Sequence, residues 1–344
     1  MEKFKIVTPK SSAEKSNAIN DNFKIELESF SKLNQEIVIA PDNSEDEFIS
    51  MAKDADAIFG NGKFSAKIIN SLNKCQIIAL GSVGTDTMDV KAATHKGIPV
   101  TNIPDTFIDE VAEHTLCLIL AAYRRIFKLD KMAKSNEWSK GRDFLYEFPR
   151  LRGQTLGLIS FGNVARSVAK RAAPFGLNII SFDPYVSETV MIDHGVSPVS
   201  LEELLTQSDI VSMHAPGGQQ TEKMMTKTHF ESMKNTALFV NNGRGSTVDE
   251  KYLIEAIEKN WIAGAALDVL EKEPPNPDNP LLKLENVILT PHVASASSRF
   301  DPARRRRMGV EVSLVLSGKW PTGCVNPEVL QNSNLKPWQP YSSK

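Results

Sequence analysis

The sequence predicts an α/β protein with two doubly wound parallel sheets. Short apolar runs alternate with helix-like segments over almost all of the 344 residues, as expected when successive βα units build a parallel sheet. The runs fall into two series, one before residue 103 and one after residue 153, with a long helical pattern between them. Two series of this kind indicate two domains, which the chain length also allows.

The apolar runs define the expected strands of each series. The first series predicts five strands, at residues 4–7, 36–40, 57–59, 77–81 and 99–102. Pro104 interrupts the pattern, and residues 109–133 then predict one long helix. The second series predicts six strands, at residues 155–160, 177–183, 210–214, 237–241, 264–269 and 287–289. Six strands make up a complete dinucleotide-binding fold.

The end of the chain is too short to fold by itself. Residues 296–327 contain one helix pattern and a segment rich in Pro and Gly, so we expect them to pack on the N-terminal domain. The expected division is therefore a discontinuous domain of residues 1–103 and 297–330 and an inserted domain of residues 104–296. Residues 331–344 are polar and are expected to form a loosely ordered tail.

The charge balance gives no reason to expect a nucleic-acid or anionic-membrane partner. Forty basic and 42 acidic residues leave a formal net charge of -2. Arg304 to Arg307 form one basic run, but four consecutive residues of a helix point in all directions and cannot form a single stripe. We expect salt bridges and solvation at the start of a helix instead.

Cysteine usage and the N-terminus indicate a cytoplasmic protein. The three cysteines, Cys75, Cys117 and Cys324, are scattered without CxxC spacing, so we expect neither a disulfide framework nor a metal site. Residues 1–10 lack the features of a signal peptide, and no run approaches 18 apolar residues. We therefore expect no association with a membrane.

Residues 155–183 carry a candidate dinucleotide site. The order is strand, turn, helix, strand and acid, with Ser160, Gly162 and Ala165 at the three positions of the glycine fingerprint. Gly162 is the position that lets a diphosphate approach, and the helix N-terminus supplies amide groups and partial positive charge. Asp183 ends the next strand, where a carboxylate accepts from ribose hydroxyls and repels a 2′-phosphate. Because no arginine follows it immediately, the sequence favours NAD over NADP.

Several ordered motifs resemble the D-isomer-specific 2-hydroxyacid dehydrogenase family, which includes phosphoglycerate and glycerate dehydrogenases and the C-terminal binding proteins. They are Gly81–Asp86, Val100–Pro104, Val111–Glu113, His214–Pro216, Asn241–Gly245 with Asp249, Leu267–Val269, Glu273–Pro274 and Thr290–His292. The resemblance implies a Rossmann NAD-binding domain inserted in a flavodoxin-like substrate domain. It also implies NAD as cofactor, a small 2-hydroxy or 2-oxo acid as substrate, and a homodimer.

The resemblance assigns catalysis to Arg244, Glu273 and His292, which all follow predicted strands. Histidine can hold or release a proton near neutral pH, so His292 is the expected acid in reduction and base in oxidation. Glu273 is expected to orient it. The planar guanidinium of Arg244 suits carboxylate and carbonyl oxygens, and it is expected to grip the substrate and polarise its C2 oxygen.

Further positions follow from the same resemblance. Val83 and Gly84 are expected to offer backbone amides to the substrate carboxylate, together with Arg244 and His292. The expected cofactor-binding residues are Ser160, Gly162, Asn163, Val164, Asp183, Pro184, His214, Pro216, Thr221, Asn242, Gly243, Arg244, Asp268, His292, Ala294 and Ser295. The other histidines, His95, His114, His194 and His229, are expected to be structural.

The sequence leaves the substrate open between glyoxylate, hydroxypyruvate and a bulkier 2-oxo acid. Residues 57–62 lack the Arg-Ser pair that some relatives carry at this strand end, which argues against a phosphorylated substrate. One alternative function is an NAD-sensing corepressor, as in the C-terminal binding proteins. Another is formate dehydrogenase, against which Glu273 argues, since relatives that oxidise formate normally replace this acid.

Overall fold

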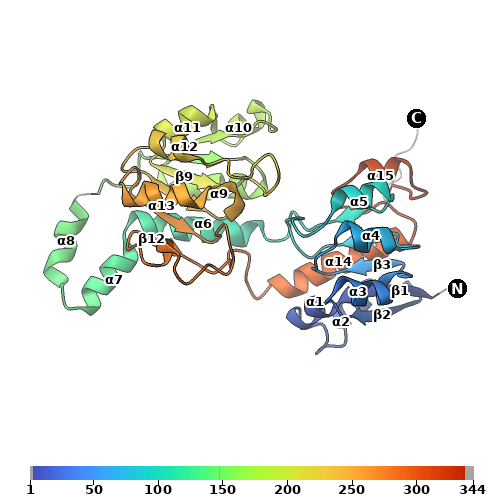
Figure 1. Cartoon of the computed structure of the whole chain (residues 1–344). Coiled ribbons are helices and arrows are strands. Elements are labelled where there is room, and N and C mark those ends of the chain that lie inside the picture. Colours follow the sequence, from blue (N-terminus) through green and yellow to red (C-terminus); the bar gives the residue numbers. More distant parts are fainter. Residues whose placement is uncertain (1–2, 147, 338–344) are drawn as a thin grey trace. The chain divides into compact units, whose positions relative to one another are not determined.

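The computed structural model describes residues 3–146 and 148–337, and the chain divides into two compact units (Figure 1). One unit contains the described residues up to Thr106 and from Ser297 onward, and the other is Phe107–Ala296. Each unit is built on one sheet in which all neighbouring strands are parallel, with helices packed on both faces. The predicted fold class is therefore confirmed.

The first unit has a five-stranded sheet in its described part, with the order β2-β1-β3-β4-β5. This is the flavodoxin-like order expected from the sequence. The strands are β1 (Phe4–Pro9), β2 (Gln35–Ala40), β3 (Ala57–Phe59), β4 (Ile77–Ala79) and β5 (Val100–Thr101). The helices are α1 (Lys10–Lys15), α2 (Lys24–Ser29), α3 (Glu45–Ala52), α4 (Ala66–Ser71), α5 (Val90–His95), α14 (Phe300–Leu316) and α15 (Glu328–Gln331).

Alternate residues of these strands point into two separate cores. Val7 and Ile58 pack into the core under α3, α4 and α5, whereas their neighbours Ile6 and Ala57 pack into the core under α14. The C-terminal helix α14 thus completes a core that the first hundred residues begin. Gly309 lets α2 approach α14 closely, since a Cβ atom there would lie 2.6 Å from the Cβ of Ser29.

The arginine run at the start of α14 is used in ion pairs inside the first unit. Arg305 is 1% exposed and forms charge-assisted hydrogen bonds of 2.6–2.8 Å with the carboxylates of Asp21 and Glu26. Arg304 pairs with Asp301 at 3.0 Å, and the guanidinium of Arg307 lies 2.9 Å from Glu311. The salt-bridge interpretation of this run is therefore confirmed.

The second unit has a seven-stranded sheet in its described part, with the order β12-β11-β10-β9-β6-β7-β8. Counted from β6, this is the 3-2-1-4-5-6 order of a dinucleotide-binding fold with one more strand at its end. The strands are β6 (Thr155–Ile159), β7 (Asn178–Phe182), β8 (Ser197–Pro198), β9 (Ile210–Met213), β10 (Leu238–Asn241), β11 (Gly264–Leu267) and β12 (Val287–Leu289).

The strand β8 was not predicted from the sequence, and the reason is physical. It has only two residues, one of which is Pro198, and a two-residue run shows no period-2 pattern. Proline is tolerated because β8 is an edge strand, where one side of the backbone needs no ladder partner.

Helices cover both faces of the seven-stranded sheet. One core lies under α6 (Ile108–Tyr123) and α9 (Asn163–Ala172), and the other under α11 (Leu201–Gln207), α12 (Lys227–Ser232) and α13 (Glu250–Glu258). The remaining helical elements are α7 (Ile126–Lys134), α8 (Trp138–Tyr146), α10 (Glu188–Asp193), η1 (Ala173–Phe175), η2 (Gly245–Thr247) and η3 (Pro280–Leu282).

The single helix predicted at residues 109–133 is wrong, because the structure breaks it into α6 and α7. Arg125 adopts a left-handed conformation with φ 54° at the break. The buried face of α6 ends at Tyr123, and α7 has no buried residue. Neither glycine nor proline marks the break, so the sequence pattern continued across it.

The polar tail is partly organised. Gln331 ends α15, the indole nitrogen of Trp320 donates to the carbonyl oxygen of Leu335 at 2.9 Å, and Trp320 N donates to Lys336 O at 2.7 Å. The expectation of loose order is thus wrong for residues 331–336, whereas residues 338–344 lie outside the described residues. Across residues 3–146 and 148–337, no helix is both long and apolar enough to cross a membrane.

Candidate active site

The predicted cofactor and catalytic residues of the second unit follow the carboxyl ends of its strands. Gly162 follows β6, Asp183 follows β7, Arg244 follows β10, Glu273 follows β11 and His292 follows β12. All of these strands are parallel, so their carboxyl ends lie along one side of the sheet. From β6 the chain adds β7 and β8 on one side of that strand and then returns to add β9 on its other side. Open α/β sheets bind ligands at such a switch point.

The turn after β6 leaves room for a diphosphate. A Cβ atom added to Gly162 would meet no atom within 4 Å, so the backbone is open to an approaching group at this position. Gly162 is also the N-cap of the ten-residue helix α9, whose first amides and dipole favour an anion. Asn163 and Val164 begin this helix, and Ala165 is buried in the core. The residues present therefore fit a dinucleotide.

Asp183 lies at the end of β7 with its carboxylate held by four donors. Its Oδ2 atom accepts from Ser160 Oγ at 3.1 Å and from Phe161 N at 2.8 Å. Its Oδ1 atom accepts from Tyr185 N at 2.8 Å and from Val186 N at 3.2 Å. The carboxylate is thus fixed where the adenine ribose is expected.

A cavity of about 400 Å³ lies beside Asp183. Its walls include Val186, Met191 and Val199 together with the acids Glu188 and Glu203. The apolar walls suit a flat base. The acids add negative charge near Asp183, which disfavours a phosphorylated ribose. Pro184 is exposed next to Asp183.

His214 follows β9 and is not suited to carry a proton at neutral pH. Burial lowers its pKa to about 4, so the ring is uncharged at neutral pH. Its Nε2 atom lies 2.9 Å from the hydroxyl of Ser212, which fixes the ring. In the loop that follows, Thr221 Oγ1 donates to the carbonyl oxygen of Pro216 and closes a turn. These contacts fit a wall of the site rather than an acid or base.

Two hydrogen bonds fix the main-chain carbonyl group of Arg244. Its carbonyl oxygen accepts from Asn241 Nδ2 at 3.0 Å and from Thr247 Oγ1 at 2.6 Å. The guanidinium donates from Nη1 to the carbonyl oxygen of Gly243 at 2.9 Å. Asn242 is buried with its side-chain amide 3.1 Å from the hydroxyl of Thr115. Arg244 therefore extends from a rigid turn.

The loop that carries Arg244 packs tightly on the loop that carries Glu273. A Cβ atom at Gly245 would lie 1.9 Å from the carbonyl oxygen of Leu270, so only glycine fits there. Leu270 N in turn donates to Glu273 Oε1 at 3.0 Å. The contact links the two loops through the backbone, and it fixes where Glu273 lies relative to the turn of Arg244.

Glu273 and His292 form a direct pair. The Nδ1 atom of His292 lies 2.6 Å from Glu273 Oε2, and the side chain of His292 is 51% exposed. His292 has a left-handed backbone with φ 53°, and its amide donates to the carbonyl oxygen of Asp268 at 2.9 Å. An Nδ1 atom bonded to a carboxylate leaves Nε2 as the ring nitrogen that can exchange a proton with a ligand.

Asp268 organises the loop of His292, a role that the sequence analysis did not assign. The carboxylate is 2% exposed and accepts from Thr290 Oγ1 at 2.6 Å, Val293 N at 3.0 Å and Ala294 N at 2.9 Å. His114, on α6, lies 3.0 Å from the Thr290 hydroxyl. The resemblance gave Asp268 only as a cofactor-binding position, and its supporting role was not evident because these partners are 22 to 26 residues away in the sequence.

Val83 and Gly84, the residues predicted to bind the substrate carboxylate, belong to the first unit. They lie in the loop after β4, where Ser82 Oγ donates to Gly84 O at 2.8 Å and Asn102 Nδ2 donates to Val83 O at 2.6 Å. Val83 is 45% exposed, so its amide lies in an accessible loop. Their role stays a prediction.

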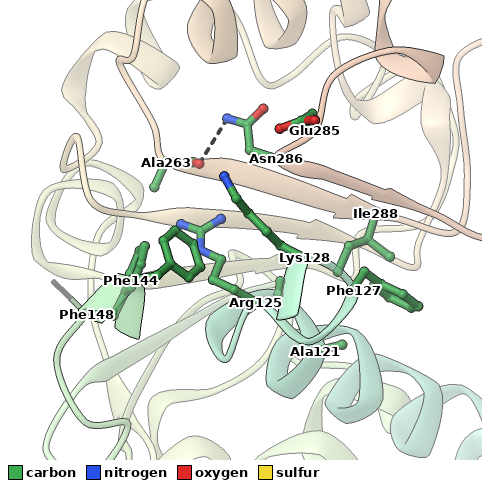
Figure 2. A pocket seen from close by; sticks show the side chains of 11 residues that line it. Ala121, Arg125, Phe127, Lys128, Phe144, Phe148, Ala263, Glu285, Asn286 and Ile288 are labelled. Atoms are coloured by element: carbon green, nitrogen blue, oxygen red, sulfur yellow. Dashed lines mark hydrogen bonds between the residues drawn. The ribbon is translucent and has the colours of Figure 1, made fainter. Parts of the chain in front are cut away.

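A second cavity, of about 210 Å³, lies away from these strand ends (Figure 2). It is bordered by the end of α6, by α7 and α8, and by Glu285 and Asn286 just before β12. The amino end of a strand is the side opposite to the carboxyl end. This cavity is therefore distinct from the predicted active site.

Comparison with known proteins identifies the family. The family model described as "D-isomer specific 2-hydroxyacid dehydrogenase, NAD binding domain" matches residues 116–294, more than half of the chain. The chain belongs to this family. The D-isomer-specific 2-hydroxyacid dehydrogenases are oxidoreductases that act on CH–OH groups with a nicotinamide cofactor. The match therefore agrees with the open turn at Gly162, with the place of Asp183 and with the Glu273–His292 pair.

Individual relatives extend the similarity beyond the second unit. A glyoxylate reductase from Korarchaeum cryptofilum is 37% identical over 286 residues, which cover 82% of this chain and 86% of that protein. A D-3-phosphoglycerate dehydrogenase from Archaeoglobus fulgidus is 42% identical over 235 residues, but the match covers 68% of this chain and 44% of that longer protein.

A solved structure shares the fold over nearly the whole chain. The NADPH-dependent glyoxylate/hydroxypyruvate reductase from Sinorhizobium meliloti, in complex with NADP and malonate, superposes with a TM-score of 0.78 and 28% identity. The alignment covers 94% of this chain and 97% of that one.

Proposed function

We propose that the chain is an NAD-dependent D-2-hydroxyacid dehydrogenase that reduces a small 2-oxo acid, with His292 as the acid/base. The carrying observation is the 2.6 Å contact between Glu273 and His292, on the side of the sheet where Gly162 and Asp183 would hold the dinucleotide. A paired histidine beside a nicotinamide is the arrangement that a carbonyl reduction needs, since one group moves hydride and the other moves a proton.

We propose residues of this chain for each part of the cofactor. The amides of Asn163 and Val164 would hold the diphosphate, and Asp183 would accept from the adenine-ribose hydroxyls. Asn242, Gly243, Asp268, Ala294 and Ser295 follow β10 to β12, and we propose that they border the nicotinamide. When bound, this group supplies or accepts the hydride at C2.

The catalytic residues would then act on the acid itself. Arg244 would bind the substrate carboxylate and polarise the C2 oxygen through its planar guanidinium. His292 would donate a proton from Nε2 to that oxygen in reduction and take it back in oxidation, while Glu273 holds Nδ1. Val83 and Gly84 would add backbone amides to the carboxylate.

An activity panel tests this function. We expect the purified protein to oxidise NADH when supplied with glyoxylate, hydroxypyruvate or a bulkier 2-oxo acid, with the preferred acid identified by kcat/KM. Of the three relatives above, the two reductases have names that support the smaller acids. A protein that binds NADH but reduces no acid of the panel would favour the corepressor-like binding role instead.

Asp183→Ala is expected to weaken the preference for NADH over NADPH. The variant loses the carboxylate that hydrogen-bonds to the ribose, so the Kd of NADH should rise about 10- to 100-fold, the value of a hydrogen bond to a charged group. The Kd of NADPH should fall or stay constant, because the repulsion is removed. Fluorescence titration with both cofactors measures this. Asp193→Ala, an exposed acid at the end of α10, is the matched control, and an unchanged ratio in Asp183→Ala would show that another residue discriminates.

We also propose that the chain is a homodimer joined through α7 and α8. These two helices have no buried residue in the structure, and they expose Ile126, Phe127, Trp138 and Tyr146. Exposed apolar side chains gathered on one segment indicate a protein interface. The same two helices carry both acidic and basic residues, so two copies can pair by charge across a twofold axis, the commonest symmetry of oligomers.

The cavity beside α7 and α8 gives a second reason to propose that another copy of the chain covers this surface. Figure 2 shows Arg125 and Lys128 beside the rings of Phe144 and Phe148. Arg125 lies 4.8 Å from the Phe148 ring centroid, burial lowers its pKa, and its Nε atom has no hydrogen-bond partner among the described residues. An anionic group of the second copy would stabilise this half-buried guanidinium.

Phe127→Glu combined with Trp138→Glu is expected to convert the dimer into monomers. A charge in the centre of an apolar interface remains desolvated and unpaired, which opposes association. Sedimentation equilibrium should give twice the mass of one chain for the unmodified protein and the mass of one chain for the variant. The control is Tyr185→Glu, an exposed aromatic residue far along the chain from α7 and α8. If the unmodified protein sedimented as a monomer at all concentrations, this would contradict the proposal.

We propose the cytoplasm as the compartment. Cys75, Cys117 and Cys324 are all free thiols in the structure, and burial raises the pKa of Cys75 to about 12. A protein with three unpaired cysteines suits a reducing environment.

A further inference from the structure

Ser160 occupies a backbone position that disfavours a side chain. It follows the last residue of β6 and has φ 75°, in the left-handed region that glycine adopts without strain. It also stands at the first glycine position of the dinucleotide fingerprint. A residue with a Cβ atom in this conformation destabilises the folded chain, so its presence calls for an interaction that glycine could not make.

The interaction that glycine could not make is the hydrogen bond to Asp183. Ser160 Oγ donates to Asp183 Oδ2 at 3.1 Å, whereas the other three donors to this carboxylate are the main-chain amides of Phe161, Tyr185 and Val186. A carboxylate offers about four lone-pair sites, and these four donors fill them. Ser160 thus supplies the one side-chain contact of the four.

A hydroxyl has a property that an amide donor lacks. It can rotate and accept a hydrogen bond as well as donate one. When a ribose hydroxyl approaches the carboxylate, Ser160 Oγ can rotate away and release Oδ2 to the sugar, whereas the main-chain donors remain fixed. The carboxylate is therefore held in position before the cofactor binds and still has an acceptor site to offer.

We propose that Ser160 is a positioning residue that orients Asp183 for the adenine ribose and so strengthens the selection of NADH over NADPH. This inference rests on the proposed use of Asp183 in cofactor binding. It goes further by assigning the discrimination to a pair of residues, one of which replaces a glycine of the fingerprint. The acids Glu188 and Glu203 line the cavity beside Asp183 and act in the same direction.

The test measures cofactor binding by the free protein, without turnover. In Ser160→Ala the strained backbone is kept and the hydroxyl is lost, so the Kd of NADH should rise roughly 2- to 10-fold, as for the loss of one ordinary hydrogen bond. The Kd of NADPH should change less than twofold, so that the preference shrinks. Ser187→Ala is the matched control, because Ser187 is nearby and its side chain makes no capping hydrogen bond.

Ser160→Gly separates the positioning role from folding. Glycine relieves the left-handed strain, so this variant should melt at a higher temperature than Ser160→Ala and yet show the same loss of NADH preference. A merely structural serine would change the melting temperature and leave the ratio of the two Kd values unchanged. That result would overturn the inference.

A double-mutant cycle shows whether Ser160 acts through Asp183. In the Asp183→Ala background, Ser160→Ala should have no further effect on the Kd of NADH. An equal effect in both backgrounds would mean that the hydroxyl acts independently of Asp183 and would overturn the positioning role. If the unmodified protein binds neither NADH nor NADPH, the proposed function itself fails. If the unmodified protein binds NADH normally and the Kd values of Ser160→Ala for both cofactors are unchanged, only this inference is rejected.

Discussion

Replacing His292 with alanine is expected to lower the rate of 2-oxo acid reduction by about 10²- to 10⁴-fold, the usual contribution of a general acid. The variant removes the ring whose Nδ1 atom lies 2.6 Å from Glu273 and whose Nε2 atom would donate to the C2 oxygen. His214 cannot take over, because burial lowers its pKa to about 4 and leaves it uncharged at neutral pH. Steady-state kinetics with NADH and the best acid of the panel measure the effect.

NADH binding provides the internal control for this variant. The contacts proposed for the diphosphate and ribose lie on the other half of the sheet, after β6 and β7. The Kd of NADH should therefore stay within about twofold, too small a change for a lost hydrogen bond. His95→Ala, an exposed histidine at the end of α5, should keep full activity. If His292→Ala retained full activity, this histidine would have no part in the mechanism.

Replacing Arg244 with alanine is expected to lower kcat/KM by roughly 30- to several thousand-fold. Removing one partner of a charged, hydrogen-bonded pair with a substrate costs about 2–5 kcal/mol, and here that partner is the substrate carboxylate. The turn should survive the change, because Asn241 and Thr247 hydrogen-bond to the main-chain carbonyl of residue 244 and not to its side chain. Kinetics over a range of acid concentrations would separate KM from kcat.

Arg244→Lys distinguishes charge from geometry. Lysine keeps the positive charge but lacks the planar fork, so we expect only partial recovery, mainly in KM. Arg306→Ala is the control, since Arg306 is exposed on α14 in the other unit. Activity of Arg244→Ala equal to that of this control would exclude a role in substrate binding.

The fold could be predicted from the sequence because the patterns that indicate its strands and helices lie within short segments of the chain. Each strand of the two sheets except β8 contains at least one apolar residue, and every strand except β5 and β8 contains at least two in a row. These runs follow one another with helices between them. Parallel sheets bury both faces of their strands, which makes such runs conspicuous. The exception, β8, contains two residues, and the break between α6 and α7 is set by where packing on the sheet ends.

The family resemblance predicted that Glu273 orients His292, and the 2.6 Å contact between the two side chains agrees with that prediction. Glu273 and His292 both follow strands, and the structure places those strands, β11 and β12, side by side. The sequence did not reveal the support around them. Asp268 holds the loop of His292 through Thr290 and two backbone amides, and these hydrogen bonds exist only once the sheet has formed.

Ser160 illustrates how a departure from a pattern is interpreted differently once geometry is known. In the sequence it is a missing glycine, which suggests weaker cofactor binding. In the structure it has a left-handed backbone and a hydrogen bond to Asp183, so the same residue supports the carboxylate that we propose binds the cofactor.

The most direct test of the proposed chemistry follows the hydride itself. The protein should be incubated with glyoxylate or hydroxypyruvate and with NADH that carries deuterium at the transferred position of C4, and the product analysed by mass spectrometry. We expect one deuterium on C2 of the 2-hydroxy acid for each NADH consumed. Bound NADH that no 2-oxo acid consumes, or a product without deuterium at C2, would contradict it.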